Sequence, residues 1–362
     1  MAIKVAWIGD VPALMTGFAT TARTVLSYLA SEGFQVACFS VSSPFDINYS
    51  YRVLKDDKPV DISFPMLILN GRDESLNSFD AVIGHWNPKY ISQASAIYDQ
   101  VWTKIKTRKI GYFVHEDRYM PHRQGEFFYN YKGDYELVLT TPAQDIWGYA
   151  KAYPDKVNFI PHALDLDAIR ERLKSHEGAE RKYITAVMAN NNVRKRWDIL
   201  LKSMPEIEWG DYRLVTPNPD GLYKLMDMID WVSSTGKHVN IRLGASSDIW
   251  EVYSQTKLLV NPTTGEAFSY PIAEALAAGA PVVATDLPEL HELYGGAITY
   301  VRSHPILQLD GPLQLEPDQK DFVKKVNLAL KSASPHPEAV SKFDVKKIGK
   351  RWADLLTNDR NA

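Results

Sequence analysis

Two glutamates on either side of a predicted loop-to-helix junction have the spacing that most directly suggests chemistry. Glu266 and Glu274 are eight residues apart. Pro271 suits the first turn of a helix, and Gly279 followed by Pro281 would end that helix. Glu266 is therefore predicted on the loop and Glu274 on the first turns of the helix. Both carboxylates could accept hydrogen bonds from a ligand bound at the junction.

The start of this helix is suited to binding an anion. Unpaired backbone amides and the positive end of the helix dipole would meet there. Four residues would contribute such amides: Phe268, Ser269, Tyr270 and Ile272. An anion with a carboxylate on each side implies a ligand that has a negative centre and hydroxyl-rich ends. A nucleotide-sugar, with its central diphosphate, has that composition.

The same segment resembles the Glu-x7-Glu signature of the retaining glycosyltransferases of the GT-B fold, in particular glycosyltransferase family 4, also called glycosyl transferases group 1. That family has a loop Pro-Ser-x-x-Glu-Gly-Phe-Gly before a helix Glu-Ala-x-Ala-x-Gly-x-Pro-Val-Val. Three stretches of this chain occupy those places, at 262–263, 266–269 and 274–283. Ala267 and Ser269 depart from the family, which usually has glycine at both positions.

The resemblance implies roles for the residues of this segment. Glu266 is expected to orient hydroxyls of the donor sugar near the reacting face, and Glu274 to accept hydrogen bonds from the ribose. The residues expected to contact the rest of the donor are Ala267, Phe268, Ser269 and Tyr270. Without the flanking match, Glu266 could equally be a solvated loop charge and Glu274 a carboxylate favoured by the helix dipole.

A basic turn follows the predicted strand Ile184–Met188. It contains Asn190, Arg194, Lys195 and Arg196. The family places a Gly-Arg pair and a Lys-Gly pair here, and their two cations stabilise the charge on the departing diphosphate. Lys195 matches the lysine, whereas Asn190 stands in the arginine position and Arg196 in the glycine position. The second cation is therefore left to Arg194 or Arg196.

Two residues of the first half are also site candidates. The loop that ends at Gly17 lacks the Gly-x-Gly-x-x-Gly fingerprint, which disfavours a dinucleotide enzyme. It resembles the family's glycine loop, so Gly17 is expected to meet the donor; the alternative is a turn glycine after a helix cap at Thr16. Strand Lys109–Val114 delivers His115 to its carboxyl end, where ligands bind in this architecture. By resemblance His115 contacts the transferred sugar; a structural histidine bonded to a main-chain carbonyl is the alternative.

No metal ion or other cofactor is expected. His115, His122 and His85 have spacings that fit no standard set of metal ligands. Asp165 and Asp167 have the spacing of a metal-holding Asp-x-Asp motif, but Asp167 directly precedes a predicted helix and is expected to cap it. Asp165 is then expected to be a hinge-loop residue.

Composition predicts a soluble protein of two domains. The chain has 362 residues, more than one hydrophobic core usually organises, and 45% are hydrophobic. The formal net charge of −3 gives no general attraction to nucleic acid, which weakens a DNA-binding function without excluding it. The single cysteine, Cys38, lies in a predicted buried strand and permits no internal disulfide. With no export signal and no apolar run of membrane-spanning length, a cytoplasmic location with at most peripheral membrane contact is expected.

Short apolar runs alternate with longer amphipathic segments, which predicts α/β domains with parallel sheets. The expected fold class is GT-B, with two Rossmann-like, doubly wound domains facing across a cleft. An acceptor domain is predicted at 1–165, a donor domain at 166–342, and a C-terminal helix at 343–362 that, by resemblance, returns to the first domain. A charged linker is predicted near 165–182. The predicted strands are Ile3–Ile8, Val36–Val41, Ala81–Gly84, Lys109–Val114, Leu137–Thr140, Val157–Ile160, Ile184–Met188, Arg213–Val215, Val239–Leu243, Leu258–Asn261, Val282–Ala284 and Ile298–Val301.

The expected function is transfer of a sugar from a UDP- or GDP-linked donor to an acceptor hydroxyl, with retention of configuration and without a metal ion. The expected acceptor is a carbohydrate, a lipid-linked molecule or a small molecule. The alternatives are a GT-B epimerase or phosphorylase, a glycosyltransferase acting on modified DNA bases, and a non-catalytic two-domain protein that binds sugars or nucleotides. Release of free nucleoside diphosphate would separate the enzymes from the binding protein.

Overall fold

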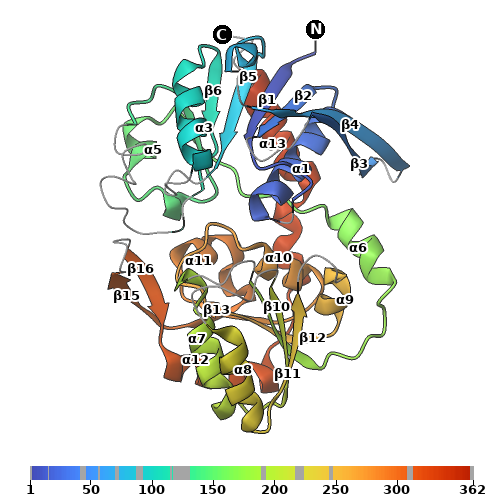
Figure 1. Cartoon of the computed structure of the whole chain (residues 1–362), viewed down its shortest axis with the longest axis vertical. Coiled ribbons are helices and arrows are strands. Elements are labelled where there is room, and N and C mark those ends of the chain that lie inside the picture. Colours follow the sequence, from blue (N-terminus) through green and yellow to red (C-terminus); the bar gives the residue numbers. More distant parts are fainter. Residues whose placement is uncertain are drawn as a thin grey trace. The chain divides into compact units, whose positions relative to one another are not determined.

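The computed structural model of the chain describes residues 2–14, 16–40, 46–55, 58–69, 73–86, 93–114, 116, 131–188, 193–216, 224–243, 248–307 and 313–358. The chain divides into two compact units. The first consists of Met1–Glu116, Met120–Ala168 and Lys342–Ala362, and the second of Asp117–Tyr119 and Ile169–Ser341. Each unit is built on one main sheet (Figure 1).

The first unit contains an eight-stranded sheet in the order β3-β4-β2-β1-β5-β6-β7-β8. Its strands are parallel except for the edge strand β3, which forms an antiparallel hairpin with β4. The chain switches direction across the sheet between β1 and β5, and ligands of doubly wound sheets bind outside the carboxyl ends of such strands. The strands are β1 (Lys4–Gly9), β2 (Gln35–Ser40), β3 (Ile47–Lys55), β4 (Lys58–Ile68), β5 (Ala81–His85), β6 (Arg108–Gly111), β7 (Glu136–Leu139) and β8 (Val157–Phe159).

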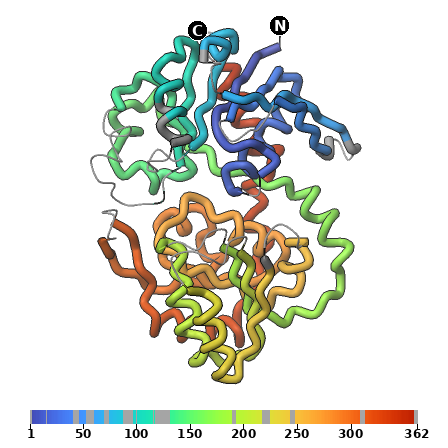
Figure 2. The backbone as a smooth tube through the Cα atoms, in the orientation of Figure 1, coloured from blue at the N-terminus to red at the C-terminus, as the bar shows by residue number. Residues whose placement is uncertain are grey.

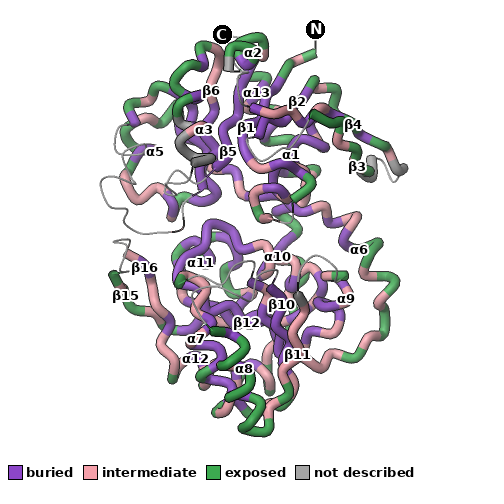
Figure 3. Tube along the Cα trace, viewed as in Figure 1, coloured by how far each residue is buried: buried purple, intermediate pink, exposed green. Residues whose placement is uncertain are grey.

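Helices cover both faces of this sheet, which explains why its central strands are almost continuously apolar. Every residue of β1 after Lys4 is buried. Trp7 and Trp352 belong to one core cluster, and Trp102 and Phe113 belong to another. Figure 3 draws the central strands mostly in the buried colour. The helices before the second unit are α1 (Gly17–Ser31), α2 (Asp73–Leu76), α3 (Gln93–Lys104) and α5 (Tyr149–Ala152).

The last helix of the chain, α13 (Val345–Asn358), packs against α1 within the first unit. Figure 2 shows this red segment lying among the blue ones. Ile348, Trp352 and Leu356 recur every four residues and are buried, so one face of α13 enters the core. At Gly349 an added Cβ would lie 2.3 Å from the ring of Tyr28, so only glycine permits this approach. The predicted return of the C-terminal helix to the first domain is confirmed.

The second unit contains a six-stranded sheet, all parallel, in the order β11-β10-β9-β12-β13-β14. A separate antiparallel hairpin, β15 (Ser303–Leu307) and β16 (Leu313–Pro317), follows β14. The main strands are β9 (Tyr183–Val187), β10 (Asp211–Thr216), β11 (His238–Leu243), β12 (Thr256–Asn261), β13 (Val282–Thr285) and β14 (Thr299–Val301). The helices are α7 (Trp197–Ser203), α8 (Leu225–Ser234), α9 (Ile249–Ser254), α10 (Tyr270–Ala277), α11 (Pro288–Tyr294) and α12 (Gln319–Ser332).

Each predicted strand overlaps a strand of the structure, so the α/β fold class with two parallel sheets is confirmed. The hairpins β3–β4 and β15–β16 were not predicted. The stretch predicted as a linker at 165–182 begins with a helix, α6 (Leu166–Lys174), because its few apolar residues suffice for one short helical face. Within the described residues, no helix combines the length and the apolar character needed to span a bilayer.

Candidate functional site

The candidate site of the second unit lies where two neighbouring parallel strands end. Strands β9 and β12 pair directly, so the segments that follow them leave the same edge of the sheet. After β12 comes the loop with Glu266, which leads into α10. The basic turn after β9 includes a single 3-10 turn, Val193–Lys195. Glu266 is on the loop and Glu274 on the helix, as predicted.

Glu266 is the centre of a buried ion-pair cluster. Its Oε1 accepts a hydrogen bond from Lys195 Nζ at 2.8 Å and lies 3.3 Å from Arg194 Nη1. The residue is only 6% exposed. Burial alone would raise the pKa of this carboxyl, but the charges of Lys195 and Arg194 outweigh it, so that its pKa lies below the ordinary value. Two cations and one carboxylate give the cluster a net positive charge at neutral pH.

The loop and the basic turn are also joined through their backbones. Thr264 N donates to Arg194 O at 2.9 Å, and Arg194 Nη1 donates to Gly265 O at 2.5 Å. These bonds hold the loop and the basic turn together next to the Lys195–Glu266 pair. The pair is therefore held by main-chain contacts as well as by its own charges.

Arg196 points away from this cluster. Its guanidinium donates twice to the Asp198 carboxylate, at 2.9 Å each, and forms an ion pair with Glu316. Its backbone is left-handed, with φ of 49°. Of the two arginines proposed as the second cation, Arg194 is the one beside Glu266. This choice depends on a backbone angle that residue types do not reveal.

Ser269, which precedes α10, has a left-handed backbone with φ of 63°. A non-glycine residue pays about 1 kcal/mol for this conformation. The chain thus keeps a glycine-like conformation where the family usually has glycine. Ser269 is also tied down, because Asn261 Nδ2 donates to its Oγ at 2.8 Å. Ala267 and Phe268 beside it are buried.

The predicted row of unpaired amides at the start of α10 is shorter than expected. Ile272 N donates to Ser269 O at 3.1 Å, so the prediction of an uncapped amide at Ile272 is wrong. The left-handed turn at Ser269 brings its carbonyl within reach of that amide. Pro271, at the first turn, has no N–H to offer. Tyr270 is the first residue of the helix.

Glu274 is positioned by a tyrosine from the preceding helix. Tyr253 of α9 donates its hydroxyl to Glu274 Oε2 at 2.8 Å. Tyr253 is fully buried, and burial together with the Glu274 charge raises the pKa of its phenol well above the usual value. The phenol therefore remains a hydrogen-bond donor at any physiological pH. Glu274 itself is partly exposed.

In the first unit, Thr16 and Gly17 begin α1 as predicted. Thr16 Oγ1 accepts a hydrogen bond from Ala19 N at 3.0 Å and donates one to Asp10 at 2.7 Å. Gly17 is the first helical residue and is exposed. The predicted site residues His115 and Asn190 lie outside the described residues.

Two buried histidines of the first unit were not predicted as site residues. His85 ends β5, beside the switch between β1 and β5, and its Nδ1 lies 2.8 Å from Tyr112 O. Its Nε2 has no hydrogen-bond partner among the described residues. His162 Nδ1 lies 2.6 Å from the Tyr112 hydroxyl. Burial lowers the pKa of His85 to about 4 and that of His162 well below its usual value. The sequence signal that could have selected His85 as a site residue is its position at the end of a predicted strand.

Asp165, and not Asp167 as predicted, holds the start of α6. Asp165 Oδ1 accepts a hydrogen bond from Ala168 N at 3.0 Å, so Asp165, expected to be a hinge residue, holds the start of α6. A cap at Asp167 would start the helix at Ala168, but the helix begins two residues earlier, at Leu166, and this places Asp167 inside its first turn. Asp167 instead pairs with Lys346 at 2.8 Å. Among the described residues no three His, Cys, Asp or Glu side chains gather in a way that could hold a metal ion.

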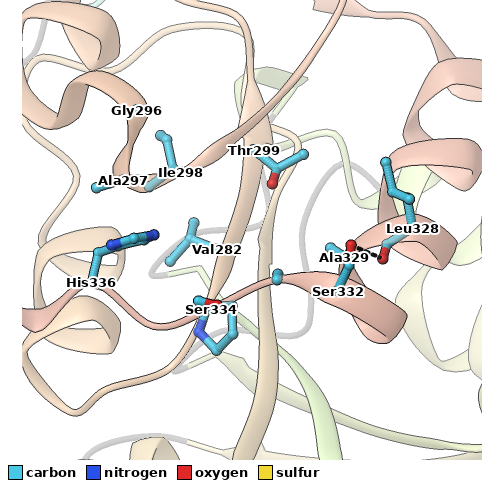
Figure 4. Close-up of a pocket in the computed structure, with 12 residues that line it drawn as sticks. Val282, Gly296, Ala297, Ile298, Thr299, Leu328, Ala329, Ser332, Ser334 and His336 are labelled. Carbon is cyan, nitrogen blue, oxygen red and sulfur yellow. Dashed lines mark hydrogen bonds between the residues drawn. The ribbon is translucent and has the colours of Figure 1, made fainter.

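A pocket of about 200 Å³ in the second unit lies elsewhere (Figure 4). Its walls include Val282 and Thr299, the first residues of β13 and β14, and His336 after α12. It is therefore at the amino-terminal edge of the sheet. None of the predicted site residues lines it, so the electrostatic cluster at the opposite edge remains the candidate site.

Comparison with known proteins confirms that the second unit resembles the family named from the sequence. Residues 181–330 match the family described as glycosyl transferases group 1, and this stretch contains Lys195, Glu266 and Glu274. The O-antigen chain mannosyltransferase RfbU of Salmonella typhimurium is 30% identical over 93 residues, which are 26% of this chain and 22% of that protein. The matched segment thus spans about a fifth of this curated relative.

Solved structures resemble the chain over almost its whole length. Sucrose-phosphate synthase of Thermosynechococcus elongatus has a TM-score of 0.72 and 14% identity, with 99% of each chain covered. HepE of Anabaena in complex with UDP-glucose has a TM-score of 0.72 and 12% identity, with 98% of this chain and all of the other covered. At such identities the likeness establishes the fold, which is GT-B.

Proposed function

We propose that this protein transfers a glycosyl group from a nucleoside-diphosphate sugar to an acceptor hydroxyl. The observation that carries the proposal is the buried cluster of Lys195, Arg194 and Glu266 beside the start of α10. It lies within the stretch that matches glycosyl transferases group 1. HepE, whose structure is similar, was solved with UDP-glucose.

Lys195 and Arg194 would stabilise the diphosphate as it leaves. The cluster carries two cations for one carboxylate, so an incoming diphosphate would be attracted to the surplus positive charge. Lys195 Nζ donates to Glu266 at 2.8 Å, and because an ammonium group has three N–H donors it could also donate to a phosphate oxygen. Such preorganised donors lower the barrier most where negative charge grows in the transition state.

The two glutamates would recognise the hydroxyl-bearing ends of the donor. Glu266 is held ionised by its cations, and an ionised carboxylate accepts hydrogen bonds from sugar hydroxyls. Glu274 would accept hydrogen bonds from the ribose while Tyr253 holds its Oε2. The main chain of Ala267 to Tyr270 lies between the two carboxylates and would contact the diphosphate.

The finer features of the proposal follow from the family resemblance. The donor is UDP- or GDP-linked, transfer retains the anomeric configuration, and no metal ion takes part. Asn190 and Gly17 contribute to donor binding, and His115 touches the transferred sugar. The acceptor is a carbohydrate, a lipid-linked molecule or a small molecule, and the reaction takes place in the cytoplasm.

The proposal is tested by measuring release of nucleoside diphosphate from a panel of UDP- and GDP-linked hexoses, with the full chain and with its Lys195→Ala variant. Lys331→Ala is the matched control, since Lys331 is an exposed lysine of the same unit that pairs only with Glu208 in the contacts described. We expect release from at least one donor, lost in Lys195→Ala and kept in Lys331→Ala. Binding of UDP or GDP without release from any donor would instead favour the non-catalytic binding protein.

A further inference from the structure

The β15–β16 hairpin stands outside the six-stranded sheet (Figure 1), yet its second strand contacts the segments of the candidate site. Residues 314–316 of β16 contact both segments that form the ion-pair cluster. One contact is with the loop of Glu266, and the other is with the turn that carries Lys195. The hairpin therefore forms a third support of the site, besides the ends of β9 and β12.

The contact with the loop is made through Thr264. Leu315 N donates to Thr264 O at 3.0 Å, and Thr264 Oγ1 donates to Gln314 Oε1 at 2.5 Å. Gln314 and Thr264 are both buried. Thr264 N in turn donates to Arg194 O, so the hairpin is linked to the basic turn through a single residue of the loop.

The contact with the basic turn is made through Arg196. Glu316 pairs with Arg196 Nη1, while Asp198 takes the other two nitrogens of the guanidinium. The remaining oxygen of Glu316 lies 3.4 Å from His304 Nε2 on β15. The Arg196 side chain is thus held on both sides, by α7 and by the hairpin.

The backbone of Arg196 is what this clamp fixes. Arg196 directly follows Lys195 and directly precedes α7, and it is left-handed, a conformation that a non-glycine residue adopts only against resistance. A return to the ordinary right-handed region would rotate the peptide bond between Lys195 and Arg196. Lys195 would then no longer be aimed at Glu266.

We propose that Glu316 is a positioning residue for Lys195: by holding the Arg196 side chain, it keeps the basic turn in the left-handed conformation that places Lys195 against Glu266. The proposal concerns geometry, and only its consequence for catalysis rests on the proposed glycosyl transfer. Glu316 touches neither Lys195 nor Glu266 in the contacts described, so residue types alone would not have selected it.

The geometric part is tested without any substrate. Lys195 is 12% exposed and paired, so it should react slowly with acetic anhydride, as measured by mass spectrometry of the labelled peptide. In Glu316→Ala we expect its acetylation to accelerate by roughly fivefold or more as the turn loosens. Arg302→Ala is the control, because Arg302 forms an exposed ion pair with Asp318 at the base of the same hairpin. It should leave Lys195 protected.

A second pair of variants tests the route through Arg196. Glycine adopts positive φ without cost, so Arg196→Gly removes the need for the clamp. Adding Glu316→Ala to Arg196→Gly should therefore change Lys195 acetylation by less than about twofold, in contrast to its effect on the wild-type chain. If Glu316→Ala fails to fold, Glu316→Gln, which keeps the length and one acceptor oxygen, should give a smaller change in the same direction.

The kinetic consequence is a fall in kcat of roughly tenfold in Glu316→Ala with little change in the donor KM, since a misaimed cation costs most in the transition state. Unchanged protection of Lys195 in both Glu316 variants would overturn the positioning role, whatever the protein catalyses. Loss of protection in a protein that releases no nucleoside diphosphate, even as wild type, would support the positioning role and reject the proposed function.

Discussion

The two units bury ionisable side chains at the same place, the carboxyl ends of their parallel strands, but they treat the charge in opposite ways. In the first unit the described contacts of His85 and His162 include the carbonyl and the hydroxyl of Tyr112, which are neutral, and burial lowers the pKa values of both histidines. In the second unit Glu266 is just as buried, yet Lys195 and Arg194 lower its pKa and keep it charged.

The difference shows that burial alone does not decide whether a strand-end site carries charge. A partner of opposite charge decides it, since desolvation and Coulomb attraction are of similar size in such places. A neutral imidazole suits contacts with hydroxyls, whereas a cluster with surplus positive charge suits a diphosphate. This contrast agrees with a donor-binding role for the second unit.

The largest expected effect comes from removing the charge that distinguishes the second unit. Lys195→Ala should lower kcat by roughly a hundredfold and raise the donor KM much less, because the diphosphate gains negative charge in the transition state. Steady-state kinetics of Lys195→Ala, Arg194→Ala and Arg196→Ala at matched stability will check it. A normal Lys195→Ala enzyme beside an inactive Arg196→Ala would show that the cation is Arg196.

Glu274→Gln should have the next largest effect. It removes the charge that Tyr253 supports and weakens the proposed ribose contact by about 1.5 to 3 kcal/mol, as expected for one charge-assisted hydrogen bond. Isothermal titration with UDP and GDP will measure it. Equal affinity of wild type and variant for both nucleotides would contradict the ribose role.

Acidification should weaken the first unit before the second. The folded pKa of His85 is about 4, below its unfolded value of 6.5, so its contribution to stability is complete above about pH 6.5 and is lost as the pH falls towards 4. The loss between pH 7 and 5.5 should be roughly 1 kcal/mol from His85 alone. Because the pKa of Glu266 lies below its ordinary value of 4.5, its contribution to the stability of the second unit is kept until the pH falls below about 4.5.

Amide hydrogen exchange of the full chain at pH 7 and 5.5, corrected for intrinsic rates, will locate this weakening. Peptides from β1 and β5 should lose protection, while peptides from β9 and β12 should not. His85→Gln should reduce the difference between the two pH values. Equal loss in both units would contradict the contrast.

The smallest expected effect is that of chelation, for which we expect none. The positive charge for the diphosphate is proposed to come from Lys195 and Arg194 rather than from a metal ion. Transfer measured in EDTA should therefore equal transfer without it. Loss of activity that manganese restores would show that side-chain cations do not suffice.

Some of this arrangement could be predicted from the sequence because local rules govern it. Pro271 and Gly279 delimit a helix by their own backbone preferences, and this placed Glu266 on the loop and Glu274 on the helix. Apolar runs marked the parallel strands, since strands buried on both faces must be apolar. The β15–β16 hairpin was missed because its short, partly exposed strands mix polar and apolar residues, whereas the apolar stretch Phe64–Ile68 of β4 is such a run and was overlooked.

The remaining features depend on contacts between distant residues. Whether Arg194 or Arg196 faces Glu266 depends on the φ of Arg196, which Asp198 and Glu316 support through their ion pairs. That Asp165 rather than Asp167 holds the start of α6 depends on a two-residue shift in where this helix begins, with Lys346 available to pair with Asp167. No pattern of residue types within either segment encodes these partners.

The packing of α13 has a consequence for how the chain is made. This helix supplies Trp352 to a core cluster of the first unit. Arg108 of β6 donates to the carbonyls of Leu355 and Leu356 near the end of α13. A ribosome completes residues 169–341 before it reaches this helix, which takes on the order of ten seconds or more at ordinary elongation rates. The second unit is therefore free to fold while the first still lacks a wall of its core, and the part synthesised first is completed last.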